Sequence, residues 1–150
     1  MTDAIRVATQ DDIPALIDIA RRFAEEITLY GIEFSALHAR EYLTLAIDHP
    51  EVLVLIGEPG AILIATLTQD FMAEPFAYVE KLYVTPEARG IGMAYGLAQG
   101  AIEWARAAGA SHVFATATAG ISDDINNAYT RLFSKLGLKP CGPVLFGRVG

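Results

Sequence analysis

The residues best suited to chemistry lie in one short segment between a predicted strand and a predicted helix. The segment spans Arg89–Ala94 (RGIGMA) and follows an apolar run that ends at Val84. The start of a helix carries backbone amides without intrahelical partners and a partial positive charge, so it can bind an anion. Gly90 and Gly92 let oxygen atoms approach the backbone where a Cβ would block them, and an arginine can add charge-assisted hydrogen bonds. The segment therefore predicts a binding site for phosphate groups.

Three kinds of phosphate-binding loop could contain such a segment, and two of them do not fit. A Walker loop needs a lysine followed by serine or threonine after its second glycine, but Met93 and Ala94 stand there. A dinucleotide fingerprint needs the spacing G-x-G-x-x-G within repeated strand–helix units. Here the third glycine, Gly96, comes one residue late, and the surrounding pattern lacks those units. The third kind is a loop for the pyrophosphate of coenzyme A.

With these residues the sequence resembles the GNAT acetyltransferase superfamily, whose main motif is Q/R-x-x-G-x-G/A after a strand. Arg89–Ala94 match the motif, and the flanking Leu82, Val84 and Pro86 also resemble the family, as does the apolar helix that follows. The predicted order of strands and helices agrees along nearly the whole chain. The resemblance implies a single domain over residues 1–150 with the GNAT fold. This is an α/β (α+β) fold whose mixed, mostly antiparallel sheet splays at the acyl-CoA site and carries helices on both faces.

The resemblance also implies which residues contact acetyl-CoA. In the family, the strand that carries Leu82–Val84 pairs through its backbone with the pantetheine arm, as an extended diamide can pair with free strand groups. The amides of the loop and of the first helical turn hold the pyrophosphate, and a second motif adds two positions in the last helix. The expected contacts are Leu82, Tyr83, Val84, Arg89, Gly90, Ile91, Gly92, Met93, Ala94, Tyr95, Asn126 and Phe133.

The second motif departs from the family at the position of its usual proton donor. Phe133 stands where the family commonly has a tyrosine that protonates the leaving thiolate, and phenylalanine has no proton to donate. Tyr129, Tyr83 or water could donate instead, and Tyr129 is our candidate. A donor could also be unnecessary, because a thiol with a pKa of about 8.5 leaves readily, or the activity could be lost.

Transfer to an amine also needs a base, and Glu80 is the candidate. It lies four residues before Val84 on the same predicted strand, so the period-two rule gives it the same face as Leu82 or Val84. From there it could take the amine's proton through a water molecule. The alternative is a carboxylate that pairs with a surface cation or is simply solvated.

Two further segments could line the acceptor site, and each has a structural alternative. Tyr30, Glu33 and Phe34 lie in a predicted loop between the first two helices, where Phe34 could equally pack in the core. Ser122–Asp124 precede the last helix and could cap it or attract a cationic amine.

Length, composition and charge favour one cytoplasmic domain. The chain has 150 residues, 53% of them hydrophobic, a net charge of −7 and a single cysteine, Cys141. The charge argues against nucleic acid and favours a cationic partner such as a small-molecule or peptide amine. No apolar run is long enough to span a membrane, and no signal peptide is evident. The histidines lack metal-ligand spacing. We therefore expect a monomer or homodimer with no metal and no membrane partner.

The hydrophobic periodicity predicts three consecutive strands that must be largely antiparallel, and one later strand–helix–strand step that suggests parallel pairing. Predicted helices cover residues 12–27, 36–48, 91–109 and the region from Ile125 to Leu136; predicted strands cover Ala4–Ala8, Val52–Gly57, Ala61–Thr68, Ala77–Val84, Ser111–Ala117 and Cys141–Val149.

Two functions follow. The first is an acetyl-CoA-dependent N-acetyltransferase in which a primary amine attacks the thioester directly in a ternary complex. The second is a non-catalytic acyl-CoA-binding sensor or regulatory module of the same fold, which Phe133 favours.

Overall fold

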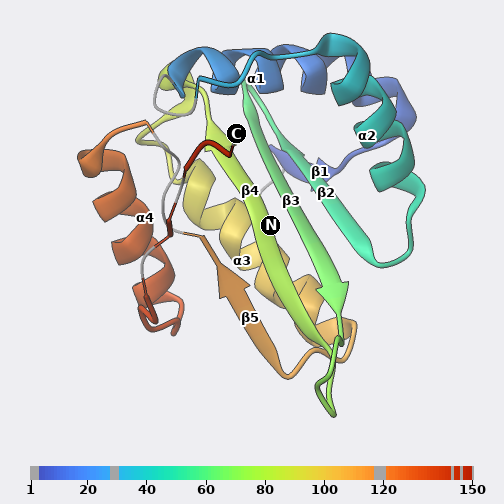
Figure 1. Ribbon diagram of the computed structural model, residues 1–150, viewed down its shortest axis with the longest axis vertical. Coiled ribbons are helices and arrows are strands. Elements are labelled where there is room, and N and C mark those ends of the chain that lie inside the picture. Colours follow the sequence, from blue (N-terminus) through green and yellow to red (C-terminus); the bar gives the residue numbers. More distant parts are fainter. Residues whose placement is uncertain (1–3, 28–30, 117–120, 143, 146, 150) are drawn as a thin grey trace.

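The computed structural model of this chain describes residues 4–27, 31–116, 121–142, 144–145 and 147–149. Strands and helices follow the predicted order as far as the last helix (Figure 1). The strands are β1 (Ile5–Val7), β2 (Val52–Gly57), β3 (Ala61–Thr68), β4 (Phe76–Val84) and β5 (His112–Ala115). The α-helices are α1 (Ile13–Glu26), α2 (Ala36–Asp48), α3 (Met93–Ala107) and α4 (Asp123–Lys135). Short 3-10 turns at Gln10–Asp12 and Pro86–Ala88 precede α1 and α3.

The strands form one sheet in the order β1-β2-β3-β4-β5. The pairs from β1 to β4 are antiparallel, and β4 and β5 run parallel. A tight turn can join antiparallel strands, whereas the parallel step needs the crossover that α3 supplies. Both expectations for the sheet are confirmed.

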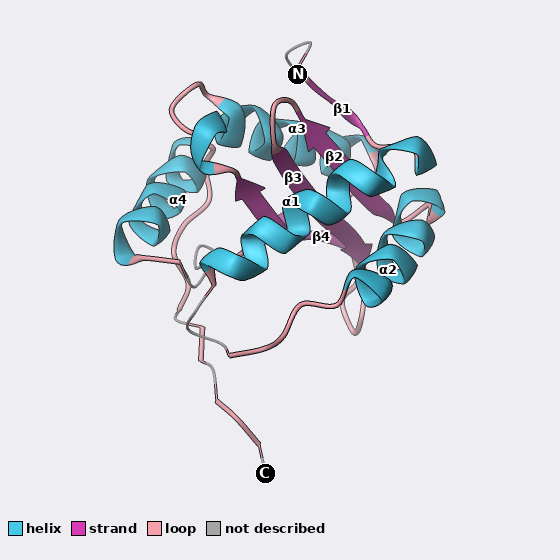
Figure 2. Ribbon diagram, turned by 90° about the horizontal axis from the view of Figure 1, so that it is seen from above, coloured by secondary structure: helices cyan, strands magenta, loops and turns pink. Residues whose placement is uncertain are grey.

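Helices cover both faces of the sheet (Figure 2). The buried side chains of α1 and α2 pack with one set of strand residues, and those of α3 and α4 pack with the other. Strand β4 contributes to both cores, because Leu82 and Val84 face α3 and α4 while Tyr83 faces α1 and α2. We call these sides the α3 face and the α2 face.

Strand β4 is irregular at Glu80. Lys81 pairs with Ile64 of β3 and Val79 pairs with Ala65, so Glu80 is an extra residue without a partner in the register. Such a β-bulge breaks the alternation of side chains between the two faces. Val79 and Leu82, three residues apart, accordingly belong to the same core on the α3 face.

The sheet opens between β4 and β5. The two strands pair only from Phe76 to Val79 on the β4 side, although β4 continues to Val84. Among the described residues, the edge of β4 that faces β5 therefore has no strand partner beyond Val79. This agrees with the splayed sheet that the sequence led us to expect.

The prediction of a strand over Cys141–Val149 is wrong for the residues described there, none of which is in a strand. Pro140 precedes this segment, and Gly142, Pro143 and Gly147 interrupt it. Proline cannot donate to a ladder and glycine weakens a strand, so the apolar residues between them do not suffice for pairing.

Candidate functional site

The predicted phosphate loop has the backbone conformation that its glycines allow. Gly90 and Gly92 have φ angles of 83° and 77°, in the left-handed region that costs other residues roughly 1–2 kcal/mol. In the described structure, nothing beyond the adjoining residues lies within 4 Å of where a Cβ would stand on either glycine. The loop therefore presents open space to which a phosphate oxygen has access.

Helix α3 begins directly after this loop. Gly92 is its N-cap, and the amide of Gly96 donates the first full-turn bond, to the carbonyl of Gly92 at 3.0 Å. The amides of Met93, Ala94 and Tyr95 precede that bond and have no carbonyl one turn back within the helix. Together with the positive end of the helix dipole, they form a site for an anion.

A cavity of about 290 Å³ lies between the start of α3 and α4. It contains most of the predicted coenzyme contacts, and Tyr129 lines it as well. Its lining includes Val84, Arg89, Gly90, Gly92, Met93, Ala94, Tyr95, Ile125, Ala128, Tyr129 and Leu132. Of the other predicted contacts, Ile91 is 64% exposed, and Phe133 is a buried residue of α4. The structure thus brings the loop motif and part of the last-helix motif to one place.

Tyr129 reaches from α4 to the open edge of β4. Its hydroxyl donates a hydrogen bond of 2.9 Å to the carbonyl oxygen of Leu82. The N–H and C=O of a strand residue point to the same side, so the Leu82 amide also faces the opening between β4 and β5. A backbone donor and a side-chain hydroxyl therefore lie together where the sheet splays.

Burial raises the pKa of Tyr129 to about 12. The hydroxyl therefore keeps its proton at neutral pH and can serve as a donor. Phe133, one turn further along α4, is buried and packs in the core on the α3 face. Asn126 lies in the first turns of α4, and its carbonyl accepts a bond from the Thr130 hydroxyl.

Arg89 points its guanidinium toward α1. Its Nη2 lies 2.8 and 3.1 Å from the two carboxylate oxygens of Glu26, and its Nε donates to the carbonyl of Val84 at 3.0 Å. The hydroxyl of Tyr83 donates to the same carboxylate. Burial, followed by the Glu26 carboxylate, raises the pKa of Tyr83. Glu26 thus joins α1 to β4 and to the phosphate loop.

A second ion pair joins the same two segments. Arg22 of α1 makes two hydrogen bonds to the carboxylate of Glu87, in the turn that precedes the loop. The Arg22 guanidinium lowers the pKa of Glu87 to about 2. Charged side chains of α1 therefore hold the approach to the phosphate loop on both sides of Ala88.

Glu80 lies on the opposite face from the one predicted. The period-two rule is wrong here because Glu80 is the bulged residue. Its carboxylate accepts hydrogen bonds from Tyr42 of α2 at 3.2 Å and from Thr66 of β3 at 3.3 Å. It therefore faces α2, while Leu82 and Val84 face α3.

The environment of Glu80 is polar but contains no paired cation. No ion pair of Glu80 within 4.0 Å occurs in the described part of the chain. The ammonium of Lys81 stands 5.9 Å from the ring centroid of Tyr42. Burial, followed by the charge of Glu80, raises the pKa of Tyr42 to about 12, so its hydroxyl donates to the carboxylate at neutral pH.

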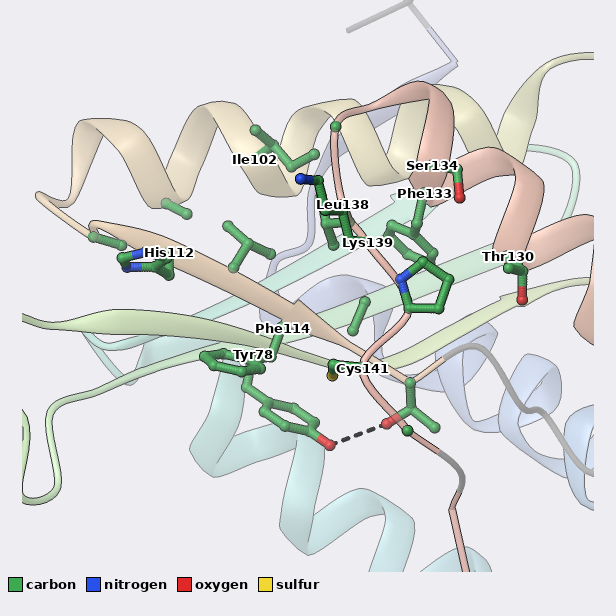
Figure 3. Close-up of a pocket in the computed structure, with 18 of the residues that line it drawn as sticks. Tyr78, Ile102, His112, Phe114, Thr130, Phe133, Ser134, Leu138, Lys139 and Cys141 are labelled. Carbon is green, nitrogen blue, oxygen red and sulfur yellow. Dashed lines mark hydrogen bonds between the residues drawn. The ribbon is translucent and has the colours of Figure 1, made fainter.

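A larger cavity of about 750 Å³ follows β5 (Figure 3). Figure 3 shows Ile102, Leu138 and Phe133 on one side of β5 and Tyr78 and Phe114 on the other. The tail at Cys141 passes close to Tyr78, so the cavity extends around the end of β5.

Sequence reasoning missed the hydrogen bonds that tie α1 and α2 to the site. They involve Arg22 and Glu26 of α1, Tyr42 of α2, and Glu87 in the turn before the loop. Each lies 38 or more positions from its hydrogen-bond partner, and no local pattern signals such a pairing. The bulge had no signal either, since an apolar strand pattern does not reveal one extra residue.

The two other acceptor predictions have different outcomes. Tyr30 lies outside the described residues, whereas Phe34 packs against the core of α1 and α2, and the guanidinium of Arg21 lies 5.7 Å from its ring centroid. Ser122 caps α4, because its hydroxyl accepts a bond from the amide of Ile125 at 3.2 Å. Packing and capping thus account for Phe34 and Ser122.

The described residues contain no cluster of three or more potential metal ligands. No helix in that part of the chain has the length and apolar character needed to cross a membrane.

Comparison with known families gives one match over most of the chain. The model of the acetyltransferase (GNAT) family matches residues 14–138. No curated protein matches the sequence significantly.

Solved structures with this fold include three informative neighbours. An integron cassette protein from the mobile metagenome of Cole Harbour Salt Marsh has a TM-score of 0.77 and 18% identity, over 97% of this chain and 90% of that chain. The aminoglycoside N-acetyltransferase AAC(6')-Iy, in complex with CoA, has a TM-score of 0.74 and 15% identity, over 97% and 93%. A 6'-N-acetyltransferase from Acinetobacter haemolyticus has a TM-score of 0.71 and 18% identity, over 100% and 99%. At these identities the likeness concerns the fold.

Proposed function

This chain belongs to the GNAT acetyltransferase family, and on that premise we propose that it transfers an acetyl group from acetyl-CoA to a primary amine. The observation that carries the proposal is the open anion site at the start of α3, next to the unpaired edge of β4. The pyrophosphate of the coenzyme needs the anion site, and its extended diamide arm needs the unpaired strand edge.

The residues around this site fit coenzyme A. A Cβ on Gly90 or Gly92 would occupy the space that the phosphate oxygens need. The amides of Met93–Tyr95 would bind the pyrophosphate, and the backbone of Leu82–Val84 would pair with the pantetheine arm. Arg89 supports the loop through its bond to Glu26 and can add positive charge. Ile91, Asn126 and Phe133 remain predicted contacts.

Acetyl-CoA supplies a thioester, whose acyl carbon accepts the amine nitrogen as the carbon–sulfur bond breaks and the thiol departs. In this proposal an ammonium acceptor first loses a proton, through water, to the carboxylate of Glu80. Glu80 faces α2, so the acceptor enters from that side of the opening in the sheet. The coenzyme occupies the α3 side.

The proton donor for the thiol and the donor for the oxyanion both come from the opening in the sheet. Tyr129 is the proposed acid, since its hydroxyl is protonated at neutral pH and lies at the β4 edge. The amide of Leu82 is the proposed oxyanion donor, because it faces the same edge. No covalent intermediate on the protein is needed.

The proposed acceptor is a small-molecule or peptide amine. The net charge of −7 favours a cationic ligand. Two of the structural neighbours are aminoglycoside acetyltransferases by name, which is consistent with a small amine. A single cytoplasmic domain, as a monomer or homodimer, completes the proposal.

Calorimetric titration with acetyl-CoA tests the proposal, with ATP and NADPH as controls. We expect saturable binding of acetyl-CoA alone, then release of thiol when amines are added. Replacing Arg89 by glutamate should weaken acetyl-CoA binding severely. Arg21→Glu makes the same charge change on α1, where Arg21 pairs with Asp18, and should leave affinity nearly unchanged. Equal affinity for Arg89→Glu and wild type would sink the assignment of the loop.

The second candidate is a non-catalytic module that binds acyl-CoA as a signal. The observation that favours it is the buried Phe133, which has no proton to donate. Tight binding of acetyl-CoA without thiol release across a broad amine panel would support this candidate. If the wild type acetylates any amine and Glu80→Gln abolishes that turnover, the non-catalytic candidate is excluded.

A further inference from the structure

We propose that an exposed aromatic platform on the α2 face binds the acceptor, and that the acceptor is a primary amine carrying an aromatic ring. The platform consists of Phe76 and Tyr78 of β4 and Phe114 of β5. The inference rests on the proposed function, which it narrows from amines in general to arylalkylamines.

Ring contacts across the parallel strand pair build the platform. The ring centroids of Phe76 and Phe114 are 5.2 Å apart in an edge-to-face arrangement, and those of Tyr78 and Phe114 are 6.5 Å apart with nearly parallel planes. The hydroxyl of Tyr78 lies 3.1 Å from that of Thr116, within hydrogen-bond distance, which fixes the ring (Figure 3). These contacts hold the three rings as one surface.

The platform is exposed although it is apolar. Tyr78 is 39% exposed and Phe114 is 44% exposed. Figure 1 shows α1 and α2 at the upper part and the side of the sheet, and no helix over the lower part of β4 and β5 on this face. A cluster of half-exposed rings is a typical binding surface, since burying it against a ligand ring gains both area and ring contacts.

The platform lies at the point where the sheet opens. Tyr78 pairs with Phe114, and the next pair, Val79 with Ala115, is the last before β4 and β5 separate. The phosphate loop and its cavity lie beyond this point on the α3 face. When the aromatic ring of the acceptor lies on Tyr78 and Phe114, the acceptor's amine-bearing chain therefore points at the opening between β4 and β5.

Charge selects for an amine at the end of the platform. Glu80 follows Tyr78 by two residues on the same face. The hydrogen bonds from Tyr42 and Thr66 fix its carboxylate without neutralising it, so a ligand ammonium completes the site. A polyhydroxylated or polycationic amine would gain the contact with Glu80 and leave the rings exposed to water. An arylalkylamine would satisfy both parts.

Thiol release from acetyl-CoA, measured with matched amines, tests the inference. The probes are 2-phenylethylamine, n-propylamine, spermidine and kanamycin. We expect kcat/KM for 2-phenylethylamine to exceed that for n-propylamine by about 30-fold, since a buried ring adds apolar area and aromatic contacts. Phe114→Leu, which keeps an apolar strand residue but removes the ring, should reduce that ratio by about fivefold. The Kd of acetyl-CoA should not change.

Phe71→Leu is the matched control, because Phe71 is fully exposed in the turn between β3 and β4; it should preserve the ratio. Circular dichroism checks that both variants fold, and Tyr78→Leu provides a second removal of a ring. Turnover that prefers spermidine or kanamycin, or a ratio unaffected in both platform variants, would overturn the inference and leave the acetyltransferase standing. Absence of acetyl-CoA binding in the wild type would overturn the proposed function first, and the inference with it.

Discussion

The two faces of β4 differ in what they offer a ligand. On the α3 face the proposed site is made mainly of backbone atoms, from the edge of β4 and from the loop with Gly90 and Gly92. On the α2 face it is made of side chains, with Glu80 held by Tyr42 and Thr66 beside the exposed aromatic rings. A backbone site is specified by a few adjacent residues, whereas a side-chain site is assembled from several elements.

This difference suggests a division of roles. The α3 face would fix the affinity for the coenzyme and, through Tyr129, protonate the departing thiolate, whereas the α2 face would select the acceptor and accept its proton. Variants on one face should then leave the property of the other face intact.

Glu80→Gln should have the largest effect. We expect kcat to fall by about 100-fold, a typical contribution of a positioned base, and the Kd of acetyl-CoA to stay the same. Steady-state thiol release and calorimetry measure the two quantities. Tyr42→Phe is the control, since it removes one hydrogen bond from Glu80 and keeps the carboxylate. Equal activity of Glu80→Gln and wild type near neutral pH would exclude Glu80 as the base.

Gly92→Ala should change the Kd of acetyl-CoA rather than kcat. An added Cβ would enter the space for the phosphate and strain a backbone with φ of 77°. We expect the Kd of acetyl-CoA to rise by about 30-fold, since charge-assisted hydrogen bonds contribute about 1.5–3 kcal/mol each. Gly109→Ala is the matched control, because Gly109 follows α3 with φ of 86° and an equally open Cβ position. If both variants bind acetyl-CoA like the wild type, the loop does not hold the phosphates.

Tyr129→Phe should lower kcat by about tenfold, since it removes one proton donor and leaves the thiol to depart unaided. Phe133→Tyr in this background tests whether a hydroxyl one turn away restores turnover. If Tyr129→Phe leaves kcat unchanged, water rather than Tyr129 protonates the departing thiolate.

The raised pKa of Tyr129 adds a stability prediction. A buried neutral phenol stabilises the fold fully below its ordinary pKa of 10.0, and this contribution is lost as pH rises through the folded value of about 12. Thermal unfolding between pH 10 and 12 should therefore depend less steeply on pH in Tyr129→Phe than in the wild type.

Glu87→Gln should have the smallest effect and concerns the link between α1 and the loop. The pKa of Glu87 falls from 4.5 to about 2 beside Arg22, so its contribution is present above pH 4.5 and lost as pH falls toward 2. Melting curves over this range should depend less on pH in Glu87→Gln. Glu25→Gln, the same change on the exposed side of α1, should keep the wild-type dependence of melting temperature on pH. The same pH dependence in Glu87→Gln and wild type would contradict the prediction.

Much of the fold could be predicted from the sequence, because local signals define it. The bounds of Val52–Gly57 and Ala61–Thr68 agree with β2 and β3, and the helix predicted over 36–48 is α2. Alternating and helical periodicity report burial directly. The strand predicted over Cys141–Val149 was wrong, because apolar content there does not offset its prolines and glycines.

The candidate site could be predicted only on one face. The loop could be proposed as a phosphate site from the sequence alone, because a helix start and adjacent glycines favour anion binding. The partner of Arg89 was not found, since Glu26 lies 63 positions away. Glu80 was named for the right strand but given the wrong face, because one bulged residue reverses the alternation.

The sequence by itself determined the order of the elements as far as the last helix, the glycine loop before α3 and the family, since each depends on residues that are adjacent in the chain. Tertiary structure alone decided three things: which face Glu80 occupies, that Tyr129 reaches the Leu82 carbonyl, and that Tyr78 and Phe114 form one exposed surface. The physical reason is that these depend on register and packing between distant segments, where a shift of one residue changes which side chains meet.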